Sequence, residues 1–244
     1  MVKVSALIPA RLNSTRLEKK LIKNLEGIPL IVRTYQNILS TKLFDEVVVI
    51  TDSDEIVNIL KEFNIKFLKS KKNHNTGTDR IAEFSKYFKS DILVNVQGDE
   101  PFVSKDDLQK IINTFKNDIE NSINVVSLMT KLDTKEEINN PNNVKVVVDK
   151  NNKSLFFSRS AIPFNRSSND INYFKHIGIY AFRNSFLNIF KKFKQTKLEL
   201  AEMIEALRII EYGYDIHMIE IDHEHISIDT IDDFKKAKSM IIKK

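Results

Sequence analysis

The chain has 244 residues, of which 42% are hydrophobic, and this is enough apolar material for a substantial globular core. It contains no cysteine, which excludes disulfides, a thiolate nucleophile and a cysteine-ligated zinc site. The net charge is +5, but basic and acidic residues are interleaved along the chain, so the charge suits a small anionic ligand better than nucleic acid.

No apolar run approaches the roughly 18 residues that a membrane-spanning helix needs. Residues 1–10 also contain no separate basic segment that leads into a long apolar one. We therefore expect a cytoplasmic protein with no membrane partner.

The first half of the chain alternates between strand and helix patterns. Apolar runs predict four strands, at residues 2–8, 46–50, 65–70 and 91–96. Amphipathic spacing predicts three helices, at residues 29–40, 51–63 and 77–88. The acidic opening of the second helix is typical of a capped N-terminus, and Thr78 is the expected cap of the third. Strands that alternate with helices predict parallel βαβ units.

The second half is less regular. A helix is expected at residues 105–116, and apolar runs predict strands at residues 124–130, 144–149, 154–158 and 176–182. A helix at residues 198–212, a strand at 216–221 and a helix from Ile231 complete the pattern. We predict one α/β domain over residues 1–244, with a mostly parallel twisted sheet, helices on both faces and a mixed-sheet elaboration.

Polar segments follow three of the expected strands, at the point where each strand ends. They are PARLNSTR after the first strand, TDSDE after the second and QGDE after the fourth. Ligands of open parallel sheets bind beyond the carboxyl ends of the strands, so these segments predict a site at that edge.

The PARLNSTR segment offers Arg11, Ser14 and Arg16, with Lys20 close behind. Guanidinium groups, hydroxyls and backbone N–H groups can hold triphosphate oxygens, whereas a solvated basic loop is the plain alternative. The sequence lacks the G-x-x-x-x-G-K-[ST] and G-x-G-x-x-G patterns, which argues against P-loop hydrolysis and dinucleotide chemistry.

Two acids at the ends of apolar runs suggest a metal site. Asp99 lies in VNVQGDEPF, and Asp229 lies in ISIDTIDDF, directly before the last expected helix. Magnesium in proteins is commonly held by one or two carboxylates together with substrate phosphates, which fits this pair. Capping of the following helix is the alternative function of Asp229.

Eight segments, in this order, resemble the 3-deoxy-manno-octulosonate cytidylyltransferases, also called CMP-Kdo synthetases. They are IPARLNSTRL, NTGTDRIAEF, VNVQGDEPF, NNVKVVVD, LFFSRSAIPF, HIGIYAF, EMIEALRIIEYG and IDTIDDF. The resemblance covers residues 4–240, and the combination of VNVQGDEP, FFSRSAIP and HIGIY is its most specific part.

This resemblance implies a Rossmann-like nucleotidyltransferase fold and a homodimer. It implies magnesium as cofactor, with CTP and the 2-keto-3-deoxy sugar acid Kdo as substrates. The implied products are pyrophosphate and CMP-Kdo, and CMP-Kdo is used in lipopolysaccharide biosynthesis. Within the single domain, we expect residues 1–120 to bind the nucleotide and residues 121–225 to bind the sugar and form the dimer.

The resemblance also implies roles for individual residues. The expected nucleotide-binding residues are Ala10, Arg11, Ser14, Lys20, Arg80, Gln97 and Asp99. Those expected to surround the sugar are Gln97, Arg159, His176, Tyr180 and Glu205. Asp99 and Asp229 would ligate magnesium, and with Arg11 and Lys20 they form the expected catalytic set.

The implied sugar pocket makes chemical sense, because Arg159 supplies a cation for the carboxylate of Kdo and the others supply donors and acceptors for its hydroxyls. Plainer interpretations exist: His176 and Tyr180 could be structural, and Glu205 could pair with Arg208 on the helix surface. The apolar face of that helix is expected at Leu200, Met203, Ile204 and Leu207.

The sequence departs from the family pattern at two places. Glu18 and Lys19 stand where many relatives have proline and glycine, which leaves the choice between Lys19 and Lys20 open. Ala206 replaces a glutamine that often follows the sugar-pocket glutamate. The alternatives to a Kdo enzyme are therefore a cytidylyltransferase for a modified octulosonic or nonulosonic acid, and a nucleotide-binding module without catalysis.

Overall fold

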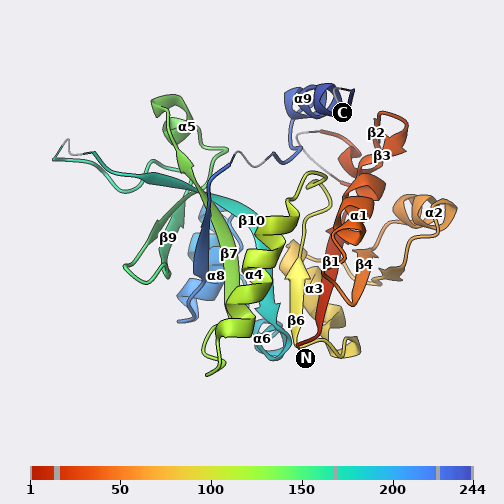
Figure 1. Cartoon of the computed structure of the whole chain (residues 1–244), viewed down its shortest axis with the longest axis horizontal. Coiled ribbons are helices and arrows are strands. Elements are labelled where there is room, and N and C mark those ends of the chain that lie inside the picture. The colour runs from red at the N-terminus through yellow and green to blue at the C-terminus, as the bar shows by residue number, and fades with distance from the viewer. Residues whose placement is uncertain (1, 14–16, 168–169, 224–225, 243–244) are drawn as a thin grey trace. The chain divides into compact units, whose positions relative to one another are not determined.

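The computed structural model describes residues 2–13, 17–167, 170–223 and 226–242 (Figure 1). The chain folds as two compact units. Unit 1 contains Met1–Gln109 together with His225–Lys244, and unit 2 contains Lys110–Glu224. Unit 1 is therefore built from both ends of the chain. No helix in the described residues is long and apolar enough to cross a bilayer.

Unit 1 contains a parallel sheet. Its strands, in the order in which they pair, are β6 (Ile92–Asn95), β1 (Val4–Ala10), β4 (Glu46–Thr51) and β5 (Phe67–Lys69). All seven residues of β1 are buried. A strand that is covered on both faces carries a nearly continuous apolar run without alternation, and this explains why β1 is apolar except for Ser5.

Helices follow the strands of unit 1 as predicted. They are α1 (Leu30–Ser40), α2 (Asp54–Glu62) and α3 (Gly77–Phe84), with the short 3-10 helices η1 (Lys20–Ile22) and η2 (Ser85–Tyr87). Both α1 and α3 contact β1 and β4. Ser53 caps α2 by accepting a hydrogen bond from the N–H of Ile56, at 3.3 Å, which agrees with the predicted capped start.

The predicted cap of α3 is wrong. Thr76 caps this helix, because its backbone is extended and its Oγ1 accepts a hydrogen bond from the N–H of Asp79 at 3.1 Å. Thr78 already lies inside the helix and is buried. The two threonines flank Gly77 in the sequence, so the pattern alone did not separate them.

The C-terminal helix α9 (Ile231–Ile242) belongs to unit 1. It lies beside the hairpin of β2 (Asn24–Leu25) and β3 (Ile28–Pro29), although these segments stand at opposite ends of the chain (Figure 1). The ammonium of Lys238 pairs with the carboxylate of Glu26 at 3.0 Å. The N-terminal and C-terminal parts of unit 1 therefore fold together.

Unit 2 contains a mixed sheet. Its strands are β7 (Val125–Leu132), β8 (Lys145–Val148), β9 (Ser154–Ser158), β10 (Tyr173–Arg183) and β11 (His217–Ile221). Strand β10 pairs antiparallel with β7 and with β8, β8 pairs antiparallel with β9, and β11 runs parallel to β7. All five strands were predicted, although β10 is longer than its expected range. Helix α4 (Lys105–Asn117) leads from unit 1 into this unit.

The predicted helix at residues 198–212 is broken in two. It consists of α7 (Lys197–Glu202) and α8 (Ala206–Glu211), separated by Met203 in the left-handed region with φ 54°. The break overturns the expected apolar face, because Met203 and Leu200 are exposed whereas Ile204 and Leu207 are buried. Helices α5 (Lys135–Asn139) and α6 (Asn184–Phe190) were not predicted at all.

Candidate active site

Two segments far apart in the sequence bring Asp99 and Asp229 together in unit 1. Asp99 lies in the turn after β6, and Asp229 lies just before α9. The N–H of Ile228 donates a hydrogen bond to the carbonyl oxygen of Asp99 at 3.0 Å. This backbone contact places the two acids next to each other.

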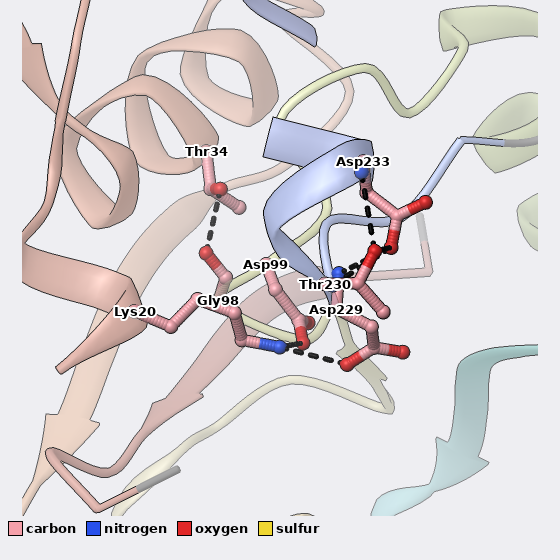
Figure 2. A network of polar contacts seen from close by, with 7 residues as sticks. All are labelled: Lys20, Thr34, Gly98, Asp99, Asp229, Thr230 and Asp233. Carbon is pink, nitrogen blue, oxygen red and sulfur yellow. Dashed lines mark hydrogen bonds and ion pairs between the residues drawn. The ribbon is translucent and has the colours of Figure 1, made fainter. Parts of the chain in front are cut away.

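Both carboxylates converge on a single cation, the ammonium of Lys20 (Figure 2). Lys20 Nζ donates to Oδ1 of Asp229 at 2.8 Å and also to Oδ2 of Asp99. Lys20 is buried at the start of η1. We call Lys20, Asp99 and Asp229 the charge triad.

The electrostatics of the charge triad favour a bound cation. Burial lowers the pKa of Lys20, but the carboxylates of Asp99 and Asp229 outweigh it, so the pKa is raised overall and the ammonium stays protonated. Burial raises the pKa of Asp99; Lys20 opposes this shift, while Glu100 and Asp229 add to it. The negative charges of Asp99 and Asp229 face each other here, so a positive charge between them is stabilising.

Gly98 lets the turn that carries Asp99 pack tightly against α1. A Cβ atom at this position would lie 3.0 Å from methyl groups of both Ile31 and Leu21. The carbonyl oxygen of Gly98 accepts a hydrogen bond from Thr34 Oγ1 of α1 at 2.8 Å (Figure 2). A larger residue would push the turn, and Asp99 with it, away from the helix.

The cap of α9 is Thr230 and not Asp229. Thr230 Oγ1 accepts a hydrogen bond from the N–H of Asp233 at 3.2 Å, and the carboxylate of Asp233 accepts one from the N–H of Thr230 at 2.8 Å (Figure 2). The N–H of Asp229 also donates to Asp233 Oδ2, at 3.1 Å. The carboxylate of Asp229 is thus directed to Lys20, and the capping alternative for this acid is wrong.

The structure separates the two adjacent lysines. Lys19 adopts the left-handed conformation with φ 50°, and its ammonium pairs with the exposed carboxylate of Glu55 at 2.7 Å. The ammonium of Lys20 instead contacts the carboxylates of Asp99 and Asp229. The geometry therefore favours Lys20 as the lysine of the site.

The other nucleotide candidates also lie in unit 1. Ala10 is the buried last residue of β1, and Arg11 follows it as an exposed side chain. Ser14 lies outside the described residues. Gln97 follows β6 and covers Gly77, where an added Cβ atom would lie 2.8 Å from its Nε2.

Arg80 is buried in α3, and the sequence did not reveal what holds it. Its Nη2 donates to Asp52 Oδ2 at 2.9 Å, in the polar segment after β4. Its Nη1 is buried without a hydrogen-bond partner in the described structure. A buried N–H group of this kind is costly unless a ligand or water accepts from it, which supports a binding role for Arg80.

In unit 2, a bulge in β10 explains the HIGIY motif. The pairing of β10 with β7 shifts between Ile177 and Tyr180, so Gly178 and Ile179 form the bulge. Ser127 of β7 fills it, because its Oγ lies 3.1 Å from the carbonyl oxygen of Ile177 and 2.8 Å from that of Ile179. Sequence patterns did not reveal Ser127, since a serine in a strand is an ordinary residue.

The bulge also brings two sugar candidates together. The rings of His176 and Tyr180 have centroids only 5.3 Å apart, although four positions separate these residues on one strand. His176 also packs edge-on against Phe157, at 4.9 Å. Burial and the nearby carboxylate of Glu205 raise the pKa of Tyr180 well above 10.0, so its hydroxyl stays protonated.

The contacts of His176 define its tautomer. Ser127 has a single hydroxyl hydrogen, which it gives to one of the bulge carbonyls, so its oxygen accepts from His176 Nε2 at 3.1 Å. Burial, with a smaller contribution from Lys175, lowers the pKa of His176 to about 3. His176 is therefore a neutral imidazole whose Nδ1 is the accepting nitrogen.

We expect Ser127→Ala to lower the free energy of unfolding by about 2 kcal/mol, because it leaves the bulge carbonyls and the His176 N–H without their buried partner. Urea denaturation measures this change. Ser154→Ala is the matched control, since Ser154 is also buried in a strand of unit 2 but its Oγ has no hydrogen-bond partner among the described residues. Equal losses for both variants would contradict the role of Ser127.

His176 makes stability depend on pH. Its pKa is about 3 in the folded protein and near 6.5 when unfolded, so below pH 6.5 the unfolded chain binds the extra proton and stability falls. The loss amounts to about 1.4 kcal/mol per pH unit and ends near pH 3. Between about pH 8 and pH 5, the parent should lose about 2 kcal/mol more than His176→Gln. An equal loss of unfolding free energy in the two proteins between these pH values, measured by denaturation, would contradict this.

Arg159 follows β9 and is held on both sides. Its Nε donates to the carbonyl oxygen of Glu202 at 2.7 Å, and its Nη1 donates to that of Pro141 at 2.9 Å. Glu205 lies half-buried directly before α8. Arg208 forms a buried two-pronged ion pair with Glu199, at 2.8 and 2.5 Å, which ties α8 to α7.

The donor set of unit 1 fits magnesium. The described residues contain no cluster of three or more His, Cys, Asp and Glu side chains that would enclose a metal alone. Magnesium does not need one, because it binds one or two carboxylates and completes its shell with waters and phosphate oxygens. Asp99 and Asp229 already share one cation, so they can supply these carboxylates.

Comparison with known proteins gives one consistent result. A family model described as cytidylyltransferase matches residues 5–219. A relative from Flavobacterium johnsoniae named 3-deoxy-manno-octulosonate cytidylyltransferase is 46% identical over 241 residues, covering 98% of this chain and 99% of the relative. A relative of the same name from Christiangramia forsetii is 44% identical over 240 residues, covering 98% of this chain and 97% of the relative.

A solved structure supports the same assignment. It is described as CMP:2-keto-3-deoxy-manno-octonic acid synthetase complexed with CTP, and it matches this chain with a TM-score of 0.91 at 31% identity, covering 99% of both chains. The predicted α/β nucleotidyltransferase fold and the family resemblance seen in the sequence are confirmed.

Proposed function

Because the chain belongs to the 3-deoxy-manno-octulosonate cytidylyltransferase family, we propose that it transfers CMP from CTP to Kdo, releases pyrophosphate and makes CMP-Kdo for lipopolysaccharide biosynthesis in the cytoplasm. The observation that carries the proposal is the convergence of Asp99 and Asp229 on one cation in unit 1. A pair of carboxylates at this place suits a divalent cation that also binds a triphosphate.

The proposed division of labour follows the two units. Unit 1 binds CTP, and the residues assigned to this task are Ala10, Arg11, Ser14, Lys20, Arg80, Gln97, Asp99 and Asp229. Unit 2 binds Kdo, with Arg159 for its carboxylate. The neutral His176 accepts through Nδ1, and the protonated Tyr180 donates through its hydroxyl, so together they suit sugar hydroxyls. Glu205 completes the polar set of unit 2, and Gln97 of unit 1 is assigned to the sugar as well as to the nucleotide.

The chemistry requires no protein nucleophile. The anomeric 2-hydroxyl of Kdo attacks the α-phosphorus of CTP, and a new O–P bond forms. The bond from the α-phosphorus to the bridging oxygen breaks, pyrophosphate leaves with that oxygen, and the hydroxyl proton passes to solvent water. When bound, magnesium neutralises charge on the phosphate oxygens. Arg11 and Lys20 orient the triphosphate, and Arg80 holds the nucleotide through Nη1, which has no partner among the described residues.

The test is an assay of the purified protein with CTP, magnesium and a panel of sugar acids. Pyrophosphate release and formation of the CMP-sugar are measured. We expect turnover with Kdo. Turnover with an amino-octulosonate or a nonulosonate in place of Kdo would keep the chemistry and reject the substrate. Binding of CTP in a calorimeter with no pyrophosphate from any acceptor would favour the non-catalytic alternative.

The panel is needed because of Ala206. Its side chain is fully buried at the start of α8, next to Glu205, and offers no polar group where many relatives are expected to have an amide. The second candidate substrate is a modified sugar acid that lacks the hydroxyl group to which such an amide would bind.

We also propose that the protein is a homodimer. Large exposed apolar side chains of unit 2 include Leu155, Phe164, Leu198, Leu200 and Met203. Exposed apolar side chains of this size can be buried against a second copy of the chain. Light scattering should give twice the chain mass of 28.3 kDa, and Phe164→Glu should shift the mass toward the monomer.

A further inference from the structure

The NNVKVVVD motif contains a buried lysine that the proposed reaction does not use. Lys145 lies in β8 and is fully buried. Its ammonium donates to the carbonyl oxygens of Asn140 at 3.0 Å, Asn143 at 2.6 Å and Arg159 at 2.5 Å. An ammonium has three N–H donors, and these three carbonyls use all of them.

Lys145 is an unusual structural residue, because no carboxylate in the described part of the chain pairs directly with its ammonium, and burying such a charge is costly. Burial, followed by repulsion from Arg159, lowers its pKa, and attraction to Glu202 opposes this shift. An apolar side chain in the same strand would avoid that cost. The position of the charge, beside the backbone of Arg159, therefore needs an explanation.

A charge of the opposite sign lies on the other side of the same residue. The carboxylate of Glu202 accepts a hydrogen bond from the backbone N–H of Arg159, at 2.9 Å from Oε2, and another from Ser158 Oγ, at 2.6 Å from Oε1. The N–H of Arg159 thus faces an anion, and its C=O faces a cation. Both backbone bonds are charge-assisted, and such hydrogen bonds are roughly twice as strong as neutral ones.

The same two residues also fix the guanidinium of Arg159. Its Nε donates to the carbonyl oxygen of Glu202, at the end of α7. Its Nη1 donates to the carbonyl of Pro141, in the loop whose neighbouring carbonyls of Asn140 and Asn143 are bound by Lys145. Backbone and side chain of Arg159 are therefore held by one network, anchored in β8 and α7.

We propose that Lys145 and Glu202 are positioning residues that hold Arg159 in the orientation in which it binds the carboxylate of the sugar acid. The inference rests on the proposed function, in which Arg159 binds that carboxylate. An arginine binds a carboxylate best through two parallel N–H bonds in one plane, so a rotation of the guanidinium weakens the contact even when the charge remains.

The experiment compares steady-state kinetics of Glu202→Leu and Lys145→Met with the parent protein. In each variant, KM for Kdo should rise about 10-fold or more, as expected for a lost charge-assisted hydrogen bond. Both kcat and KM for CTP should stay within about threefold of the parent values, because the network lies in unit 2, which is proposed to bind the sugar acid. Glu202→Gln keeps an amide oxygen for the N–H of Arg159 and should restore most of the Kdo affinity.

A double-mutant cycle with Arg159→Ala separates positioning from general damage. If Glu202 acts through Arg159, adding Glu202→Leu to Arg159→Ala should raise KM for Kdo by no more than about twofold. Asp118→Asn is the matched stability control, because Asp118 is also a well-paired acid of unit 2, bound to Arg183 at 2.6 Å. It should lower the melting temperature and leave KM for Kdo unchanged.

Three results would overturn the inference. The first is an equal increase of KM for Kdo and for CTP in Glu202→Leu, and the second is an increase of KM for Kdo in Asp118→Asn as large as that in Glu202→Leu. The third is a double variant in which the increases of KM for Kdo from Glu202→Leu and Arg159→Ala multiply. If Glu202→Leu does not fold, Lys145→Met decides by the same criteria. Lack of turnover of Kdo by the parent protein would instead reject the proposed function, and an unchanged KM in Arg159→Ala would reject the role of Arg159.

Discussion

Replacing Asp99 by asparagine should lower turnover of Kdo and CTP by about 100-fold or more, as removal of a positioned electrostatic group does in other enzymes. The amide keeps the size of the side chain but takes one charge from the charge triad, which leaves Asp229 as the single carboxylate facing Lys20. Excess magnesium should not restore the rate, because an amide is a poor substitute for the lost carboxylate. Initial rates over a range of magnesium concentrations measure both effects.

Two controls keep this result from being confused with misfolding. The free energy of unfolding of Asp99→Asn should differ from that of the parent by less than about 2 kcal/mol. The substitution removes an ion pair, but it also removes the desolvation penalty of a buried carboxylate. Asp54→Asn makes the same chemical change at an exposed acid of unit 1, which pairs with Lys69, and should keep the parent rate. A near-normal rate for Asp99→Asn would remove Asp99 from the proposed metal site.

The second large effect is expected for Lys20→Met. Turnover should again fall about 100-fold or more, because the variant lacks the lysine that we propose orients the triphosphate. Thermal stability should fall as well, since methionine leaves two carboxylates facing each other without their shared counter-charge. Added magnesium should therefore raise the melting temperature of Lys20→Met more than that of the parent, by supplying the missing positive charge. Scanning calorimetry with and without magnesium measures this difference.

The adjacent lysine gives the matched control for this variant. Lys19 is exposed and pairs with Glu55, and exposed pairs of this kind contribute little to stability. Lys19→Met should thus keep both the rate and the magnesium response of the parent protein. The same loss in both lysine variants would mean that the loop as a whole, and not the ammonium of Lys20, carries the effect.

Much of unit 1 could be predicted because its chemistry is local to the strand ends. An apolar run that stops at a glycine and an acid marks the carboxyl end of a buried strand, and this pattern identified Asp99 and Asp229. That they meet follows from the backbone bond between Ile228 and Asp99, which no local pattern contains. The choice of Lys20 over Lys19 likewise depended on the left-handed backbone at Lys19.

The sequence was less informative about unit 2, where tertiary contacts override local patterns. Helical spacing over residues 198–212 predicted one helix, but the chain breaks at Met203. The ion pair between Glu199 and Arg208 holds the two short helices across that break, at positions that an unbroken helix would not bring together in this way. Ser127, Lys145 and Glu202 act through hydrogen bonds to particular backbone groups, and such partners leave no periodic signal in a sequence.

The contact between Lys20 and Asp229 spans 209 positions, and all of unit 2 is encoded between Asp99 and Asp229. A chain emerging from the ribosome has therefore released both Lys20 and Asp99 long before Asp229 becomes available. The contact can form only when nearly the whole polypeptide has been made, and it then closes a long loop at an entropic cost. Translation that stops inside unit 2 would yield a fragment unable to assemble its cation-binding centre, however well its early strands had formed.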